Sequence, residues 1–156
     1  MLIVESGVGM VDSESYISVD YANAYFDKRI TKDEWDLIVD KEKVIIGAMD
    51  YIETSYKYKG TKLNPNQALE FPRLINGSVE FPTRLKNAVC ELALKNSKGV
   101  LLEDTERATI REKVGELEVE YDKDSPQGVE YKYVFNLIAP WLDNTSSYSS
   151  SIVRTY

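Results

Sequence analysis

The sequence predicts a mainly α-helical protein, a small helical bundle with a short β-hairpin and an extended C-terminal arm. Several stretches repeat apolar residues at the spacing of one helix face, whereas residues 116–121 alternate as a half-exposed strand does. Residues 144–156 are rich in Ser, Thr and Tyr and have no core-forming period. A chain of 156 residues buries a sufficient core as one domain without disulfides. We therefore expect a helical domain over residues 1–143 and an arm over residues 144–156.

Two short helices are predicted near the N-terminus. Ser18 is a favourable N-cap for a helix over residues 19–28, and Asp20 places a negative charge in its first turn. Thr31 has the same capping chemistry for a second short helix. Trp35 is expected to anchor that helix in the core or at a subunit contact.

The longest early helix is expected over residues 41–56, beginning after Asp40. Its apolar stripe consists of Val44, Ile45, Ala48, Met49 and Ile52. Residues 56–65 then form a polar connection with several lysines and Gly60.

Proline and glycine define the next elements. Phe71 precedes a proline and is predicted to be extended, as well as packed in the core or at a subunit contact. Asn76-Gly77 is a strong turn signal. Pro82 suits the first position of a helix over residues 82–97, which Gly99 terminates. Its predicted buried face contains Leu85, Val89, Leu92 and Ala93.

The pattern changes period after residue 110. Leu117, Val119 and Tyr121 alternate with acidic residues, which predicts a strand, and residues 108–112 are candidates for its hairpin partner. The acids on the other face are Glu116, Glu118 and Glu120. A last helix is expected over residues 131–142, ending or interrupted near Pro140.

Composition argues against an enzyme. The chain has no histidine, so it lacks the commonest general base and the commonest transition-metal ligand. Cys90, the only cysteine, lies between apolar residues of a predicted helix and is expected to pack near the core. Acidic pairs such as Asp33 with Glu34 fit helix starts better than a catalytic site. We expect no catalytic residues, no metal and no cofactor. No apolar run is long enough to span a membrane.

Charge and tyrosine content bear on the choice between DNA and protein partners. The formal net charge of −7 disfavours nucleic-acid binding, which depends on cations that meet phosphates. The stretch from Tyr56 to Lys59 alternates tyrosine and lysine and has the composition of a stacking site for single-stranded bases. Tyrosine is equally favoured in protein interfaces, and the acidic chain favours that second interpretation.

A series of ordered motifs resembles a known family. They are SYISVDYANAYF at 15–26, AMDYI at 48–52, QALEFPR at 67–73, FPTRLKNAVCELA at 81–93 and EKVGELEVEY at 112–121. The series is similar to small tailed-bacteriophage proteins, the head-to-tail adaptors beneath the portal ring, whose members are often described as DnaT-like single-stranded-DNA-binding proteins. The resemblance covers roughly residues 2–142.

The resemblance implies a structural protein of the virion neck, assembled in the host cytoplasm. Its partners would be the portal protein, further copies of itself in a ring of twelve, and the tail or next connector protein. Double-stranded DNA would pass through the ring without specific binding, and no membrane would be involved. The description as a DNA-binding protein implies the alternative, a single-stranded-DNA-binding replication protein.

Two sets of residues are candidates for these contacts. The arm offers Tyr148, Ile152, Val153, Arg154 and Tyr156 to a portal, and the alternative is an unstructured chain end. The strand offers Glu116, Glu118 and Glu120 to a channel, where negative walls would let DNA slide, and the alternative is a solvated sheet face.

Overall fold

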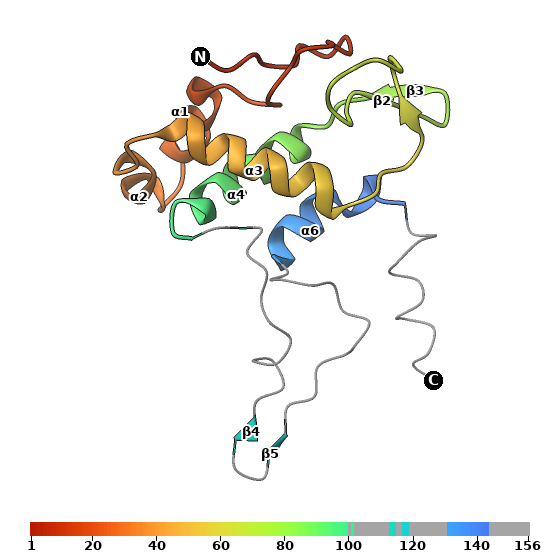
Figure 1. Ribbon diagram of the computed structural model, residues 1–156. Coiled ribbons are helices and arrows are strands. Elements are labelled where there is room, and N and C mark those ends of the chain that lie inside the picture. The colour runs from red at the N-terminus through yellow and green to blue at the C-terminus, as the bar shows by residue number, and fades with distance from the viewer. Residues whose placement is uncertain (100, 102–112, 115–116, 119–130, 144–156) are drawn as a thin grey trace.

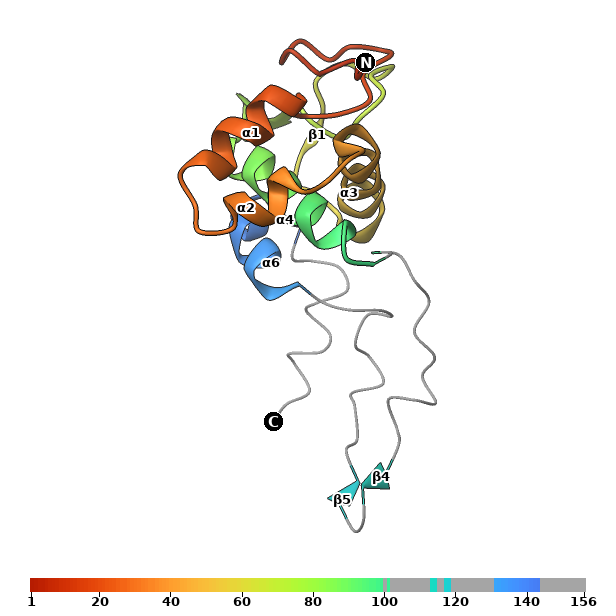
Figure 2. The ribbon, with the colours of Figure 1, turned by 90° about the vertical axis from the view of Figure 1, so that its left-hand side faces the viewer.

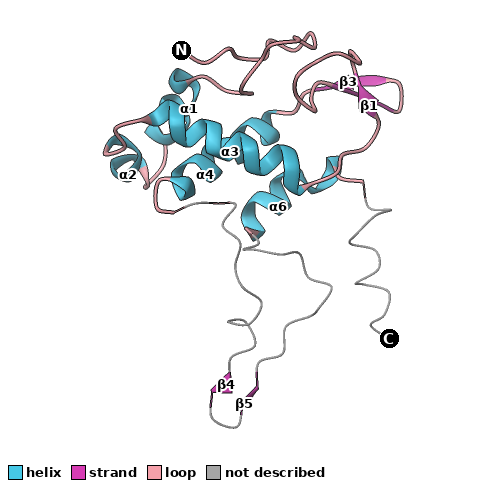
Figure 3. Cartoon of the chain, in the orientation of Figure 1, coloured by secondary structure: helices cyan, strands magenta, loops and turns pink. Residues whose placement is uncertain are grey.

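The computed structural model describes residues 1–99, 101, 113–114, 117–118 and 131–143. Within these ranges the protein is mainly α-helical, with five α-helices, one 3-10 helix and two small antiparallel sheets (Figure 1, Figure 3). The predicted fold class is confirmed. The arm at 144–156 lies outside the described residues.

The first two helices form where the sequence predicts them. α1 spans Val19–Asp27, and the Ser18 hydroxyl accepts a hydrogen bond from the Tyr21 backbone N–H at 3.0 Å, which caps the helix. α2 spans Lys32–Asp36, but Thr31 makes no side-chain capping bond.

The core lies between α3 (Lys41–Ser55) and α4 (Thr83–Asn96), which pack closely along their lengths. The prediction for α4 was wrong by one residue, because Pro82 occupies the N-cap with extended dihedrals and the helix begins at Thr83. The predicted buried face is confirmed. The largest fully buried side chains include Trp35, Tyr16, Phe26, Phe71, Ile45, Ile52, Leu85 and Leu92.

The last helix ends just before Pro140, where an end or interruption was predicted. α6 spans Lys132–Ile138 and packs against α4, with Val134 and Ile138 fully buried. Ala139–Trp141 then form a 3-10 turn that contains Pro140, since proline cannot supply the N–H that continues an α-helix.

A three-stranded antiparallel sheet lies at one end of the body. It consists of β1 (Thr61–Lys62), β2 (Arg73–Ile75) and β3 (Ser78–Glu80), in the order β1-β2-β3. The β2–β3 hairpin turns at Asn76 and Gly77, whose φ angles of 54° and 84° fit the turn predicted there. The strand β1 within the expected polar connection was not predicted.

Two described strands form the second sheet. β4 (Lys113–Val114) pairs with β5 (Leu117–Glu118), with Val114 opposite Leu117. The hairpin is therefore confirmed, but its described partner strand begins at Lys113, and residues 108–112 lie outside the described part. Figures 1 and 2 show both strands apart from the helices.

Candidate functional site

Two of the motifs, those at 15–26 and 81–93, join α1 to α4. The Tyr21 hydroxyl donates to Asn87 Oδ1 at 2.8 Å, and the Tyr25 hydroxyl donates to Glu91 Oε2 at 2.6 Å. Cys90 beside them is fully buried, as expected. These motif residues therefore hold two helices together.

The QALEFPR motif builds the base of the three-stranded sheet. Gln67 is buried, and its amide nitrogen donates to the carbonyls of Leu69 and Pro72. Phe71 is fully buried, and the Phe71–Pro72 peptide bond is cis. Arg73 is buried and donates to several carbonyls of the chain leading into β1. The motif is thus an internal brace.

A half-buried carboxyl links this brace to α3. Glu53 accepts hydrogen bonds from the Tyr16 hydroxyl and from the Glu70 backbone N–H, the latter at 2.9 Å. Burial raises the pKa of the Glu53 carboxyl to about 7, against the opposing effect of these two bonds. The Tyr16 hydroxyl also accepts from the Phe71 N–H at 3.1 Å. Both carboxylate oxygens are therefore used to connect α3 with the motif.

Another carboxyl, which is buried, organises the N-terminal loop. Glu5 accepts bonds from the N–H groups of Gly7, Gly9 and Met10 and from the Ser13 hydroxyl. Burial alone would raise the pKa of Glu5, but these donors lower it below its usual value. The arrangement is that of a loop closed on a carboxylate.

The tyrosine–lysine stretch is only partly available for stacking. Tyr58 is buried, donates to the Ile52 carbonyl at 2.8 Å and packs edge-on against Phe71. Tyr56 packs against Tyr51 and Phe135. Lysines 57 and 59 are exposed. The geometry therefore provides cations without the interleaved free rings that a single-stranded-base platform needs.

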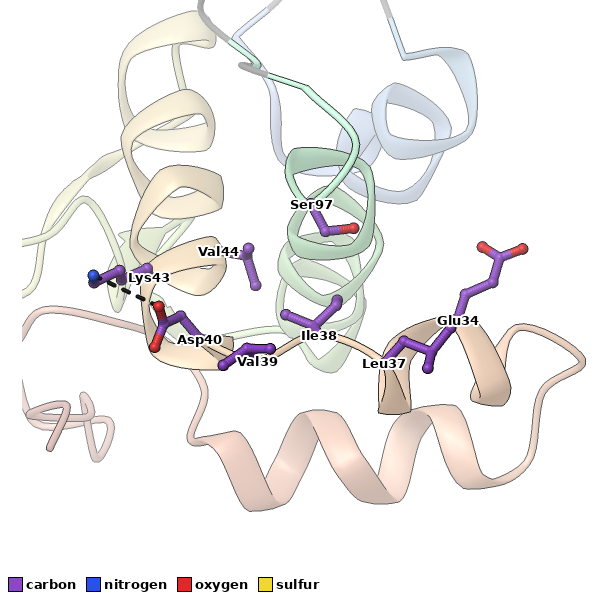
Figure 4. Close-up of a pocket in the computed structure, with 8 residues that line it drawn as sticks. All are labelled: Glu34, Leu37, Ile38, Val39, Asp40, Lys43, Val44 and Ser97. Carbon is purple, nitrogen blue, oxygen red and sulfur yellow. Dashed lines mark ion pairs between the residues drawn. The ribbon is translucent and has the colours of Figure 1, made fainter.

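The described residues also contain an open pocket of about 390 Å³. It lies at the N-terminal end of α3, between the turn after α2 and the end of α4 (Figure 4). Its lining residues are Glu34, Leu37, Ile38, Val39, Asp40, Lys43, Val44 and Ser97. Asp40 Oδ2 lies 3.6 Å from Lys43 Nζ at the pocket, and Glu34 Oε1 lies 2.8 Å from Lys98 Nζ. Its apolar floor and mixed charges suit a protein side chain better than a reaction centre.

This pocket was not predicted from the sequence. The available signal was the run of three apolar residues, Leu37 to Val39, between a short helix and an N-cap. Apolar residues in such a run would be expected in the core, but Leu37 and Val39 are 81% and 92% exposed. Only the tertiary structure shows that these two side chains face outward, whereas Ile38 packs against the core.

The predicted contact residues fall mostly outside the described part. This applies to the arm residues Tyr148, Ile152, Val153, Arg154 and Tyr156, and to Glu116 and Glu120. Glu118 lies in β5, opposite Lys113. The structure therefore brings no predicted contact residues together.

Two kinds of site are absent from the described residues. Within the described ranges no group of three or more Cys, Asp or Glu side chains is placed to hold a metal ion. No helix in the same part of the chain is long and apolar enough to cross a membrane.

Comparison with known proteins gives one match. No curated protein and no solved structure matches the chain. Residues 1–155 match the family described as "Putative DnaT-like ssDNA binding protein". Since the match spans nearly the whole sequence, the chain belongs to this DnaT-like family.

Proposed function

We propose that this protein is a structural head-to-tail adaptor of a tailed bacteriophage, which forms a ring under the portal and extends the DNA channel. The observation that carries the proposal is the uneven distribution of charge. Residues 102–130 contain ten acidic and four basic residues, a net charge of −6, whereas the whole chain carries −7. The helical body is thus almost neutral.

This distribution fits a channel protein. The acidic segment contains the β4–β5 hairpin, which lies apart from the helices (Figure 2). A negative surface facing packaged DNA repels the phosphates, so the DNA slides without being held. The hairpin acids Glu116, Glu118 and Glu120 would face the channel in this arrangement.

The arm is proposed to bind the portal. Tyr148, Ile152, Val153 and Tyr156 provide apolar anchors, and Arg154 can pair with an acid of the portal. A segment that becomes ordered on binding covers a large surface at low affinity per contact. The arm follows Asp143, whose N–H donates to the Lys57 carbonyl at 2.9 Å, so its root is attached to the sheet end of the body.

The family description supports the second candidate, a single-stranded-DNA-binding replication protein. Such a protein needs a basic groove with stacking rings. In the described part, Tyr58 is buried, so the exposed Lys57 and Lys59 have no free ring of Tyr58 between them on which a base could stack. These features favour the adaptor.

One pair of assays separates the two functions. Purified protein is mixed with portal-bearing heads that lack it, and binding is followed by co-sedimentation, with portal-free heads as the control. Single-stranded DNA binding is measured across a salt series. We expect binding to portal-bearing heads and no meaningful DNA affinity at physiological salt. Tight DNA binding that weakens steeply with salt, without head binding, would establish the replication protein instead.

Deletion of residues 144–156 tests the arm. The shortened protein should keep its melting temperature, because it retains all of the core residues named above, but should not bind portal-bearing heads. A control variant, Arg154→Lys, keeps the charge and should bind. Equal head binding by the shortened protein and the full chain would show that the arm is dispensable.

A further inference from the structure

The pocket at the start of α3 is open and apolar in the described part of the chain. Leu37 and Val39 at its rim are 81% and 92% exposed, whereas Ile38 and Val44 are half-buried. Figure 4 shows these four side chains between the start of α3 and the end of α4. Exposed apolar side chains around a hollow are typical of a surface that another segment covers.

The charges around the pocket do not select a charged occupant. Asp40 lies 3.6 Å from Lys43, and Glu34 lies 2.8 Å from Lys98, so acids and lysines already pair there. Exposed pairs of this kind contribute little to binding. The pocket therefore fits a segment that carries little charge and is held by apolar burial.

The last described residues of the chain lead back to α3. Tyr58 and Leu142 form an antiparallel bridge, and the Asp143 N–H donates to the Lys57 carbonyl at 2.9 Å. Because the chain leaves the C-terminal end of α3 through Lys57 and Tyr58, the antiparallel partner approaches that same end. The arm at 144–156 is therefore attached at the C-terminal end of α3.

The length of the arm matches the length of this helix. α3 is about 22 Å long at 1.5 Å per residue, and the pocket lies at its other end. Figures 1 and 3 show α3 running from the side of α2 to the side of the three-stranded sheet. An extended chain covers about 3.3 Å per residue, so residues 144–152 span up to about 30 Å. Ile152 is thus within reach of the pocket of its own chain.

The arm also has the composition that the pocket fits. Its aliphatic residues are Ile152 and Val153, and Arg154 is its one charged residue. Side chains alternate between the two faces of an extended chain, so Tyr148, Ile152 and Tyr156 face the same way. An extended arm therefore presents one aliphatic side chain between two aromatic rings.

We propose that in the free protein the arm lies along α3 of its own chain, with Ile152 in the pocket and Tyr156 over Leu37 and Val39. Burial of these apolar side chains provides the attraction. In one clause this rests on the proposed function, since the portal would bind the same arm residues and would have to displace them from the pocket. The docked arm is then a self-inhibited state.

This contact is near balance between docked and free arms, because the portal has to release it. An equilibrium constant of about one adds only RT ln 2 to the stability of the fold. The melting temperature of the protein shortened by the arm therefore stays close to that of the full chain. The contact must be detected by trapping it rather than by unfolding.

Cross-linking within one chain tests the docked arm. The protein carries Lys43→Cys at the exposed rim of the pocket and Thr155→Cys in the arm, and neither change removes an apolar side chain. It is treated with a bifunctional maleimide at a series of protein concentrations, and the linked peptides are identified by mass spectrometry. The natural Cys90 is fully buried and burial raises its thiol pKa, so it does not react.

The matched control carries Val79→Cys together with Thr155→Cys. Val79 is exposed and precedes Glu80, which accepts a hydrogen bond from the Trp141 indole at 3.3 Å, two residues before the arm root at Asp143. An arm without a preferred position would therefore meet the control cysteine at least as often as the cysteine at the pocket.

We expect several-fold more cross-linked monomer from the Lys43→Cys protein than from the Val79→Cys control, with a yield that does not change with protein concentration. A yield equal to the control would overturn the proposal. A product that is mainly dimer and grows with concentration would overturn it as well, because the arm would then bind another copy.

Substitutions in the contact separate the pocket from general crowding. Leu37→Ser with Val39→Ser, or Ile152→Ser alone, should lower the cross-linking yield to that of the control. Ile30→Ser is the matched surface variant, because Ile30 is 99% exposed and does not line the pocket, and it should leave the yield unchanged. An undiminished yield after the pocket substitutions would show that the arm is held elsewhere.

The result is independent of the adaptor assay. Cross-linking above the control in a protein that does not bind portal-bearing heads would keep the docked arm and reject the adaptor. Head binding without cross-linking above the control would keep the adaptor and reject the docked arm.

Discussion

Arg73→Lys tests whether the QALEFPR motif braces the sheet. The Arg73 guanidinium donates to the carbonyls of Tyr58, Lys59, Gly60 and Glu70 and to the Glu70 carboxylate, at 2.6 to 3.3 Å. A lysine ammonium is a single point and reaches only one or two of these acceptors. At least two buried carbonyls then lose their donor, at roughly 1–3 kcal/mol each. We expect a loss of about 3–5 kcal/mol in the free energy of unfolding.

Urea unfolding at neutral pH measures this loss. The matched control is Arg84→Lys, because Arg84 is exposed, donates to the Asn136 carbonyl at 2.9 Å and lies over the Trp141 ring. The control should cost less than about 1 kcal/mol. If Arg73→Lys lowers the free energy of unfolding no more than Arg84→Lys does, the carbonyls near β1 do not depend on the guanidinium and Arg73 does not brace the sheet.

Three further predictions concern stability. Glu53 has a pKa of about 7 in the folded protein against an ordinary 4.5, so the stability from its protonated form, on the order of 3 kcal/mol, is lost as the pH rises between these values. Glu53→Gln should remove this dependence of the free energy of unfolding on pH, and an unchanged dependence would contradict the burial argument. Gly60→Ala should lower the free energy of unfolding by well over the roughly 1–2 kcal/mol expected of Gly77→Ala. Both glycines have positive φ, but only at Gly60 would the added Cβ meet a backbone carbonyl oxygen, that of Leu74. Equal losses for the two variants would refute this close approach. Trp35→Ala should lower the free energy of unfolding by about 3–5 kcal/mol, since Trp35 is fully buried. Ile30 is exposed, so the control Ile30→Ala should change stability by less than about 0.5 kcal/mol. Similar melting temperatures for the two variants would place Trp35 outside the core.

Local signals predicted the helices well. The cap at Ser18 and the spacing of apolar residues in α3 and α4 act within one or two turns, so the sequence alone carries them. The turn at Asn76-Gly77 was predicted for the same reason. The ends of α1, α3 and α4 differ from the predicted bounds by one residue, and at the start of α4 the reason is that Pro82 takes the N-cap position.

The strand β1 and the role of Tyr58 were not predictable in this way. β1 has two residues and no alternating pattern, and it exists because β2 and Arg73 hold it. Tyr58 follows a polar helix end and looks exposed in sequence, but the aromatic ring of Phe71 and the carbonyl of Ile52 enclose it. Contacts between residues far apart in the chain have no local signature.

The sequence by itself determined the mainly helical class, the burial of residues such as Trp35 and the gathering of acidic residues in 102–130. The reason is that hydrophobic periodicity and local charge depend only on the order of residues along the chain. Only the tertiary structure decided which exposed apolar residues are neighbours. Leu37 and Val39 form one surface with α3 and α4, and Leu74 forms another with Val79 through strand pairing. The physical reason is that a surface is assembled from segments whose proximity depends on the packed core, which no single segment encodes.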